Sequence, residues 1–339
     1  MTPIKMPTIK DVALLAGVGV GTASRVLSGR GSVSPKTAER VQKVIAELKF
    51  KPSHAARSLL SGTSQMIGVY IPLLKGTFYT PILAAIDTEL RMTGRHMVVA
   101  FGSGAGNMRD QAIGGVNFLF QKGCDGLIIM SNALLEKDLT ALGENRKKII
   151  ILNHFYKSIA DQCFMADHKA GGRIAAEAFL AKGHRQFAIF AGPDYALDNL
   201  ERIDSFLAVL KKQKVKKSEI FIRKSDFSPE GGYACAKELI QSKHSFTALF
   251  CANDEMAVGA LSFFQSIRLM VPTQVSVMGY DDTQSAEFSA PHLTSVHIPW
   301  HAITLNSVRY LLKLCYKESY PVQRNFSTSL TWRASVTSL

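Results

Sequence analysis

A short segment near the amino terminus contains side chains that can read the edges of DNA bases. Val20, Gly21, Thr22, Ser24 and Arg25 lie together in the chain. A valine or threonine methyl group can contact a thymine methyl group, a serine can reach phosphate or base, and an arginine can donate two hydrogen bonds to guanine. The small residues would allow a close approach to the base edges. These residue types also occur on solvent-exposed helices of ordinary bundles, so both interpretations stay open at this point.

A second set of polar residues follows the ends of apolar segments farther along the chain. In open α/β sheets, ligands bind beyond the carboxyl ends of the strands. Carboxylates and amides at that edge can hydrogen-bond the hydroxyl groups of a small ligand, and aromatic rings can cover its apolar face. Each residue could also serve only as a helix cap or turn former. The set comprises Asn153, Asp194, Asp198, Asn253, Asp254, Tyr280, Asp281 and Asp282.

Three short helical patterns position the first set. One runs from Ile9 to Leu15 after Thr8, the next follows Val18 and ends at Leu27, and the third opens at Ser34. Ser34 is a favourable helix cap, and the proline after it suits the first helical position. Two helices joined by a turn at a glycine form the helix-turn-helix unit that places its second helix in the major groove.

The charge of the chain is concentrated in the same region. The formal net charge is +13, and residues 1–63 contain ten lysines and arginines against three acidic residues. A basic surface of this kind is typical of a nucleic-acid partner, although charge alone can also serve solvation.

Residues 53–63 form a helix-compatible segment that is too short to be stable alone in water. It contains His54, Ala56 and Leu59. The segment therefore needs a partner, and a linker helix packed on the following domain is one way to provide it.

From residue 64 onwards, apolar segments rich in β-formers alternate with amphipathic helical ones, which favours parallel sheets with helices on both faces. The number of strands favours two α/β lobes with a cleft between them. We expect helices at Pro81–Met92, Arg109–Lys122, Gly171–Lys182, Asn199–Lys212, Pro229–Ser242 and Met256–Ile267. The expected strands are Met66–Ile71, Met97–Phe101, Gly126–Met130, Ile149–Leu152, Phe187–Ala191, Thr247–Cys251 and Val275–Gly279.

The chain resembles the lactose and galactose repressor (LacI/GalR) family over essentially its whole length. In the head, the resemblance rests on Thr8-Ile9-Lys10-Asp11-Val12-Ala13, Ala16-Gly17-Val18 and Thr22-Ala23-Ser24-Arg25-Val26-Leu27. In the sensor, it rests on Ala191-Gly192-Pro193, Ala252-Asn253-Asp254-Glu255-Met256-Ala257-Val258-Gly259-Ala260, Pro272 and Val275-Ser276-Val277-Met278-Gly279-Tyr280-Asp281-Asp282.

The resemblance implies a small all-α helix-turn-helix head with a hinge helix, followed by a two-lobed α/β sensor like the periplasmic binding proteins. It divides the chain into a head at 1–52, a hinge helix at 53–63 and an effector-binding and dimerisation domain at 64–339. A homodimer would bind a palindromic double-stranded operator, and Leu59 would wedge into the minor groove. The DNA-contacting residues would be Thr8, Val20, Gly21, Thr22, Ser24, Arg25, Ser34, His54, Ala56 and Leu59.

Two features of the head depart from the family pattern. Glycine stands at position 19, where the family usually has a serine that caps the recognition helix, and Gly21 adds a second flexible residue. Val20 and Gly21 fall at the positions that choose the operator in the family, so we expect this chain to prefer an operator sequence of its own.

The same resemblance assigns an effector site. Arg202, Asn253 and Asp281 match effector-binding positions of the family, and Trp300 matches an aromatic residue that stacks on the ligand. Phe78, Asn153 and Asp198 fall at more variable effector positions. The effector is expected to be a sugar or phosphorylated sugar, with a nucleobase or other metabolite acting as corepressor as the alternative. Ser205 replaces a usual glycine, and Asn153 and Asp198 differ from the lactose repressor, so the effector is expected to differ too.

Several classes of protein are disfavoured by the sequence. No secretion signal or membrane span is apparent, which favours a cytoplasmic protein over a secreted sugar-binding protein. The five cysteines lack metal-site or disulfide spacing, no catalytic motif is present, and we expect no metal or cofactor. The sequence therefore predicts a repressor of a carbohydrate-utilisation operon, and not an enzyme. The absence of trailing leucine heptads favours a dimer over a coiled-coil tetramer.

Overall fold

The computed structural model describes residues 7–29, 31–50, 62–103 and 106–339. The chain divides into two compact units, Met1–Met66 and Ile67–Leu339. We refer to the first as the head and to the second as the sensor.

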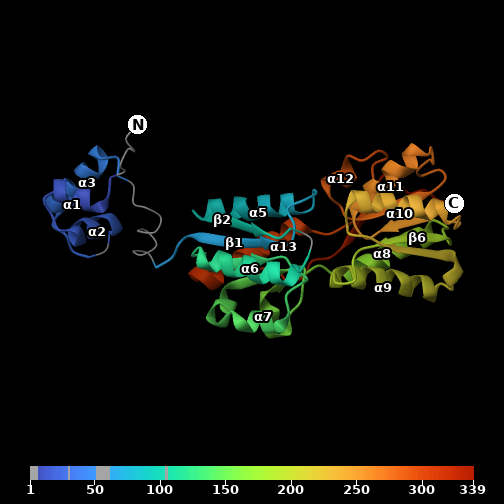
Figure 1. Ribbon diagram of the computed structural model, residues 1–339, viewed down its shortest axis with the longest axis horizontal. Coiled ribbons are helices and arrows are strands. Elements are labelled where there is room, and N and C mark those ends of the chain that lie inside the picture. Colours follow the sequence, from blue (N-terminus) through green and yellow to red (C-terminus); the bar gives the residue numbers. More distant parts are fainter. Residues whose placement is uncertain (1–6, 30, 51–61, 104–105) are drawn as a thin grey trace. The chain divides into compact units, whose positions relative to one another are not determined.

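The described part of the head contains three helices that enclose a small core (Figure 1). Thr8 and Asp11 cap the first helix reciprocally, and the Ser34 hydroxyl accepts a hydrogen bond from the Thr37 amide at the start of the third. The first two helices meet at 108°, within the range of a helix-turn-helix. The three predicted helices are confirmed as α1 (Ile9–Leu15), α2 (Val20–Ser28) and α3 (Pro35–Glu47).

The head core explains which faces of these helices remain exposed. Val12, Ala13, Ala23 and Val41 are buried, and Gly17 turns the chain between α1 and α2 with a φ of +61°. That backbone conformation is costly for any residue with a Cβ atom. Ala23 faces inward and Val26 and Leu27 pack against the same core, which leaves Val20, Gly21 and Arg25 exposed on α2.

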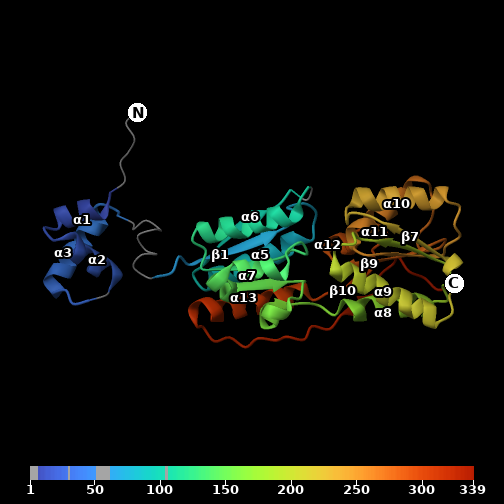
Figure 2. The same cartoon turned by 60° about the horizontal axis from the view of Figure 1, so that its bottom comes forward.

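The first lobe of the sensor is a five-stranded sheet of order β2-β1-β3-β4-β5, and β1, β3, β4 and β5 pair in parallel. Ile128 lies opposite Val69 on one side and Ile150 on the other, and all three are fully buried. Figure 2 shows helices above and below this sheet. The elements are β1 (Met66–Ile71), α5 (Tyr79–Met92), β2 (His96–Phe101), α6 (Met108–Gln121), β3 (Gly126–Ile129), α7 (Glu136–Ala141), η1 (Gly143–Lys148), β4 (Ile149–Leu152), η2 (Lys157–Gln162) and β5 (Cys163–Phe164).

The second lobe is a six-stranded sheet of order β11-β10-β9-β8-β6-β7, parallel except for the β10–β11 pair. Helices α8 and α9 pack together, as do α10 and α11 (Figure 1). The elements are α8 (His168–Ala181), β6 (Phe187–Ala191), α9 (Leu197–Lys212), η3 (Lys217–Glu219), β7 (Ile220–Lys224), α10 (Pro229–Gln241), β8 (Ala248–Cys251), α11 (Asp254–Ser266), β9 (Ser276–Asp281), α12 (Gln284–Glu287), β10 (Thr294–His297) and β11 (Ser329–Thr331).

One further helix, α13 (Trp300–Tyr316), follows the second lobe in sequence but packs on α5, β3 and β4 of the first. The chain therefore crosses between the lobes three times, after β5, after β10 and after α13. This arrangement confirms the predicted two-lobed α/β architecture.

Parts of the prediction were wrong in detail. Tyr280 and Asp281 are the last residues of β9 rather than residues that follow it. The prediction also omitted four strands and three α-helices, namely β5, β7, β10, β11, α7, α12 and α13.

No single helix in the described part of the chain is long and apolar enough to cross a membrane, whereas α1 and α2 pass that test only as a pair bent by 108°. The five cysteines are free, and three of them, Cys124, Cys235 and Cys251, are buried. Burial raises the pKa of each of these three thiols.

Candidate effector site and DNA-contacting head

A cavity of about 280 Å³ lies between the lobes of the sensor. The structure brings all seven predicted effector residues to its wall: Phe78, Asn153, Asp198, Arg202, Asn253, Asp281 and Trp300. Phe78 and Asn153 come from the first lobe, Trp300 begins α13, and the other four come from the second lobe. Closure of the lobes therefore assembles one wall from residues distant in sequence. Their role in binding an effector stays a prediction.

The Arg202 guanidinium is held by two hydrogen bonds and by an aromatic ring. Its NH2 group donates to Asp198 Oδ2 at 2.6 Å, and its NH1 group donates to the Ala252 carbonyl. It also lies 4.0 Å from the centre of the Tyr280 ring. Burial acts to lower the pKa of Arg202, but several nearby acidic groups, of which Asp198 has the largest effect, together outweigh it and the pKa is raised. The side chain is therefore a fixed positive charge at the back of the cavity.

His168 links the two lobes behind this pair. Its Nε2 atom lies 2.6 Å from Asn153 Oδ1 of the first lobe, and its Nδ1 atom lies 3.0 Å from the Tyr280 hydroxyl of the second. The imidazole is fully buried, and burial together with the charge of Arg202 lowers its pKa, so the ring is neutral. The contact also holds Asn153, whose φ of +62° places it in the left-handed region.

Asp281 and two aromatic residues form another part of the wall. The Trp300 indole donates from Nε1 to Asp281 Oδ1 at 3.3 Å, and its ring meets the Phe78 ring edge to face at 5.3 Å between centroids. Burial raises the pKa of Asp281 to about 6. Its backbone has a φ of +99°, a strained conformation for a residue with a side chain.

Asn253 serves the fold as well as the wall. Its Oδ1 atom accepts the Met256 amide at the start of α11, and its Nδ2 atom donates to the Phe227 carbonyl at 2.9 Å. Both ends of the amide therefore have protein partners.

The pattern of strand ends did not identify several other residues of the cavity wall. Glu255, which directly follows the predicted Asn253 and Asp254, lines the cavity. The only sequence signal for it is its position in the family motif that begins at Ala252. Asp254 itself is fully buried beneath the wall, where it accepts hydrogen bonds from Ser295 and Thr283. Asp194 is not in the cavity lining and pairs with Lys224 instead. The remaining unpredicted lining residues include Tyr79, Asn132, Tyr195, Asp226 and Phe227.

The charges around the cavity are unequal. Four carboxylates line it, from Asp198, Asp226, Glu255 and Asp281, against the cations of Arg202 and Lys75. Arg202 forms an ion pair with Asp198, and the Lys75 ammonium lies 3.4 Å from Glu230. Such a wall suits hydroxyl donors and disfavours an anion.

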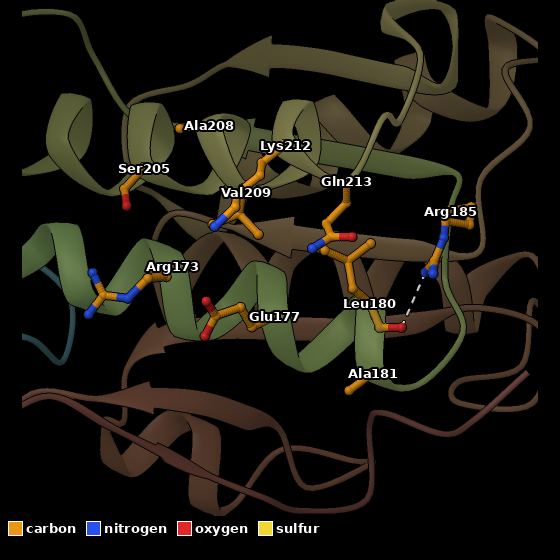
Figure 3. A pocket seen from close by; sticks show the side chains of 10 residues that line it. All are labelled: Arg173, Glu177, Leu180, Ala181, Arg185, Ser205, Ala208, Val209, Lys212 and Gln213. Carbon is orange, nitrogen blue, oxygen red and sulfur yellow. Dashed lines mark hydrogen bonds between the residues drawn. The ribbon is translucent and has the colours of Figure 1, made fainter.

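A larger hollow of about 510 Å³ lies on the outer face of the second lobe (Figure 3). Most of its side chains come from α8 and α9, Arg185 and Gln213 follow those helices, and none of the lining residues is a predicted effector residue. The rim includes Arg173, Glu177, Arg185 and Lys212, all of which are exposed. Of these two hollows, only the smaller one has buried polar groups that converge on it. We therefore place the candidate site in the smaller cavity.

On the head, α2 presents the predicted base-reading residues. Val20, Gly21 and Arg25 are exposed, and Thr22 and Ser24 are partly exposed. The hydroxyls of Thr8 and Ser34 form helix caps, so capping is a structural role for both residues. His54, Ala56, Leu59 and most of the predicted hinge helix lie outside the described residues.

Comparison with known proteins agrees with both units. Residues 8–53 match the model of bacterial regulatory proteins of the lacI family, and residues 176–336 match a periplasmic binding protein-like domain. A transcriptional regulator of the LacI family from Burkholderia phymatum is 43% identical, with a TM-score of 0.77, over 80% of this chain and 99% of that one. This chain belongs to the lacI family. The family resemblance predicted from the sequence is therefore confirmed.

Two further structures of the family cover almost the whole chain. The lac repressor dimer bound to operator and the anti-inducer ONPF is 28% identical, with a TM-score of 0.83, over 98% of this chain and 100% of that one. The transcriptional regulator CelR in complex with cellobiose is 28% identical, with a TM-score of 0.67, over 97% and 99%. The lacI-family chain is a transcriptional regulator, which confirms the prediction that it is not an enzyme.

Proposed function

We propose that this lacI-family regulator represses a carbohydrate-utilisation operon, and that a sugar in the sensor cavity sets its affinity for the operator. The observation that carries the proposal is the convergence of the seven predicted effector residues on one cavity between the lobes. Carboxylates and amides supply hydrogen-bonding groups, and Phe78 and Trp300 supply an aromatic wall. The cellobiose complex of CelR and the operator complex of the lac repressor support the same proposal.

The cavity favours a sugar without a phosphate group over a phosphorylated one. A phosphate would enter a wall with four carboxylates, where Arg202 already binds Asp198 and the Ala252 carbonyl. Leaving a buried charge without a partner costs about 3–5 kcal/mol. The volume of about 280 Å³ suits a ligand of one or two sugar rings.

On the DNA side, we propose that the exposed face of α2 reads the operator in the major groove and that residues 53–63 order on the minor groove. Two copies of the chain would bind the halves of a palindrome, in the cytoplasm where the operator is accessible. The exposure of Val20, Gly21 and Arg25 supports the first part. The hinge, with Leu59 as its wedge, rests on the family resemblance alone.

The test begins with selection of DNA from a random pool by the full-length protein. We expect enrichment of a palindrome, and Arg25→Ala should lose affinity for it while retaining binding to unrelated DNA. Selection without any palindrome would contradict the proposed dimeric operator complex.

The selected DNA then reports on the effector. Neutral mono- and disaccharides, their phosphate esters and their acidic derivatives are titrated into the protein–DNA complex, and release is followed by fluorescence anisotropy. We expect a neutral sugar to act and its phosphate ester to act at least tenfold more weakly. Tighter operator binding with a purine base would instead support the corepressor alternative.

A further inference from the structure

We propose that Glu255 is a positioning residue that clasps the two lobes together at the edge of the cavity before any effector binds. Glu255 lies in the first turn of α11 in the second lobe. Thr77 lies between β1 and α5 in the first lobe. The Thr77 amide donates to Glu255 Oε1 at 2.6 Å, and the Thr77 hydroxyl donates to the same oxygen at 2.8 Å. Two charge-assisted hydrogen bonds thus join the lobes through a single atom.

The backbone beside Thr77 is shaped for this contact. Gly76 has a φ of +74°, and a Cβ atom there would lie 2.7 Å from each carboxylate oxygen of Glu255. A side chain at this position would be strained by the backbone conformation and would also collide with the carboxylate. The glycine therefore lets the loop approach Glu255 closely enough for the Thr77 amide to donate.

The neighbouring contacts between the lobes are weaker. The hydroxyls of Thr77 and Ser285 lie 2.9 Å apart, and Lys75 lies 3.4 Å from Glu230. The side chains of Lys75 and Glu230 are 59% and 71% exposed, and such pairs contribute little because water and salt screen them. Glu255 is therefore the centre of this group of contacts.

The clasp also has a direct connection to the cavity, because Glu255 lines it together with Phe78 and Asn253. A preformed closed arrangement raises the apparent affinity of a ligand that binds only that arrangement. Loss of the clasp should then weaken effector binding even where the lobes fold normally. This last step rests on the proposed function, whereas the clasp itself does not.

Hydrogen–deuterium exchange of the full-length protein without effector tests the clasp. In the wild type, the Thr77 amide should exchange slowly for an exposed loop, because its N–H group is bonded to Glu255. Glu255→Ala should accelerate exchange in a peptide covering residues 72–80 by at least tenfold. Glu255→Gln keeps an acceptor oxygen at the same place and should restore most of the protection. Equal exchange in the wild type and Glu255→Ala would overturn the proposal.

Two further variants separate the clasp from general damage to the lobe. Gly76→Ala acts from the first lobe, so it should accelerate exchange of the same peptide while leaving exchange in α11 unchanged. Lys75→Ala removes only the exposed pair and should change exchange less than twofold. Unchanged exchange in Gly76→Ala would also overturn the clasp. If the clasp is present but no sugar binds, the proposed function fails and the clasp stands.

Discussion

Asp198 and Arg202 lie one turn apart on α9, and their side chains form an ion pair with 2.6 Å between Oδ2 and NH2. The side chains are 10% and 2% exposed, respectively. Burial acts to raise the pKa of Asp198, but the charge of Arg202, together with the effects of His168 and of hydrogen bonds from two asparagines, outweighs it and the pKa is lowered. A pair of residues assigned to effector binding is thus also part of the folded core of the lobe.

Arg202→Ala is therefore expected to abolish the effector response and also to destabilise the sensor. The substitution leaves Asp198 as a buried charge without its partner, at a cost of about 3–5 kcal/mol. Urea unfolding measures the loss in free energy. The double variant Asp198→Asn/Arg202→Met removes both charges and should recover part of that stability. A loss below about 1 kcal/mol in Arg202→Ala would show that the pair is not structural.

Trp300 should report effector binding by fluorescence, because it is one of two tryptophans in the chain and lines the cavity. The other, Trp332, is 48% exposed and is not part of the cavity wall. Trp300→Phe should abolish the change in emission on addition of an effector, and Trp332→Phe should retain it. A signal that disappears only in Trp332→Phe would place the effector elsewhere.

Gly21→Ala should stabilise α2 by about 0.5–1 kcal/mol, because alanine is the better helix former. No atom lies within 4 Å of a Cβ built at this position, so the methyl group meets no obstacle. Hydrogen exchange in residues 20–28 should slow by about two- to fivefold. Gly17→Ala is the matched control, and it should destabilise the head because Gly17 has a φ of +61°. Faster exchange in Gly21→Ala would contradict the packing described for α2.

The stability of the sensor should fall with rising pH because of Asp254. Burial, aided by the charge of Asp281, raises the pKa of Asp254 from 3.8 to about 8. Between these values the folded state keeps a proton that the unfolded chain has released, so the unfolding free energy falls as pH rises, and the fall ends near pH 8. Where the folded and unfolded states differ by one bound proton, the unfolding free energy changes by about 1.4 kcal/mol per pH unit.

Asp254→Asn should remove this contribution while keeping a polar group near Ser295 and an oxygen for Thr283. Unfolding free energies of the wild type and variant are compared at pH 6.5 and 8, above the value of about 6 for Asp281. The wild type should lose more stability over this interval than the variant. Parallel curves for the two proteins would show that Asp254 is ionised in the folded state throughout.

The sequence predicted the regular elements well where burial follows a simple period. The head helices and the central strands, such as Phe187–Ala191, fall where the apolar pattern placed them. Helix α13 was missed because its buried residues include Thr304, Asn306 and Ser307, which obscure the apolar stripe. Strand β7 was missed because Arg223 and Lys224 face solvent at the edge of the sheet.

The cavity could be predicted from the family resemblance but its supporting contacts could not. His168 meets Asn153 and Tyr280, which lie 15 and 112 positions away in the chain. Glu255 meets Thr77, 178 positions away. The pairs with Asn153 and Thr77 join one lobe to the other, and the pair with Tyr280 joins α8 to β9 within the second lobe. No local pattern of residue types encodes contacts between such distant segments.

The return of α13 to the first lobe determines when that lobe can be completed during synthesis. The strands β3 and β4 and the helix α5 are made early, yet the helix that covers them begins only at Trp300. The first lobe therefore leaves the ribosome with an apolar face exposed, and it stays open to aggregation and proteolysis until nearly the whole chain has emerged. A premature stop codon before residue 300 would thus leave the first lobe incomplete although all five of its strands had been translated.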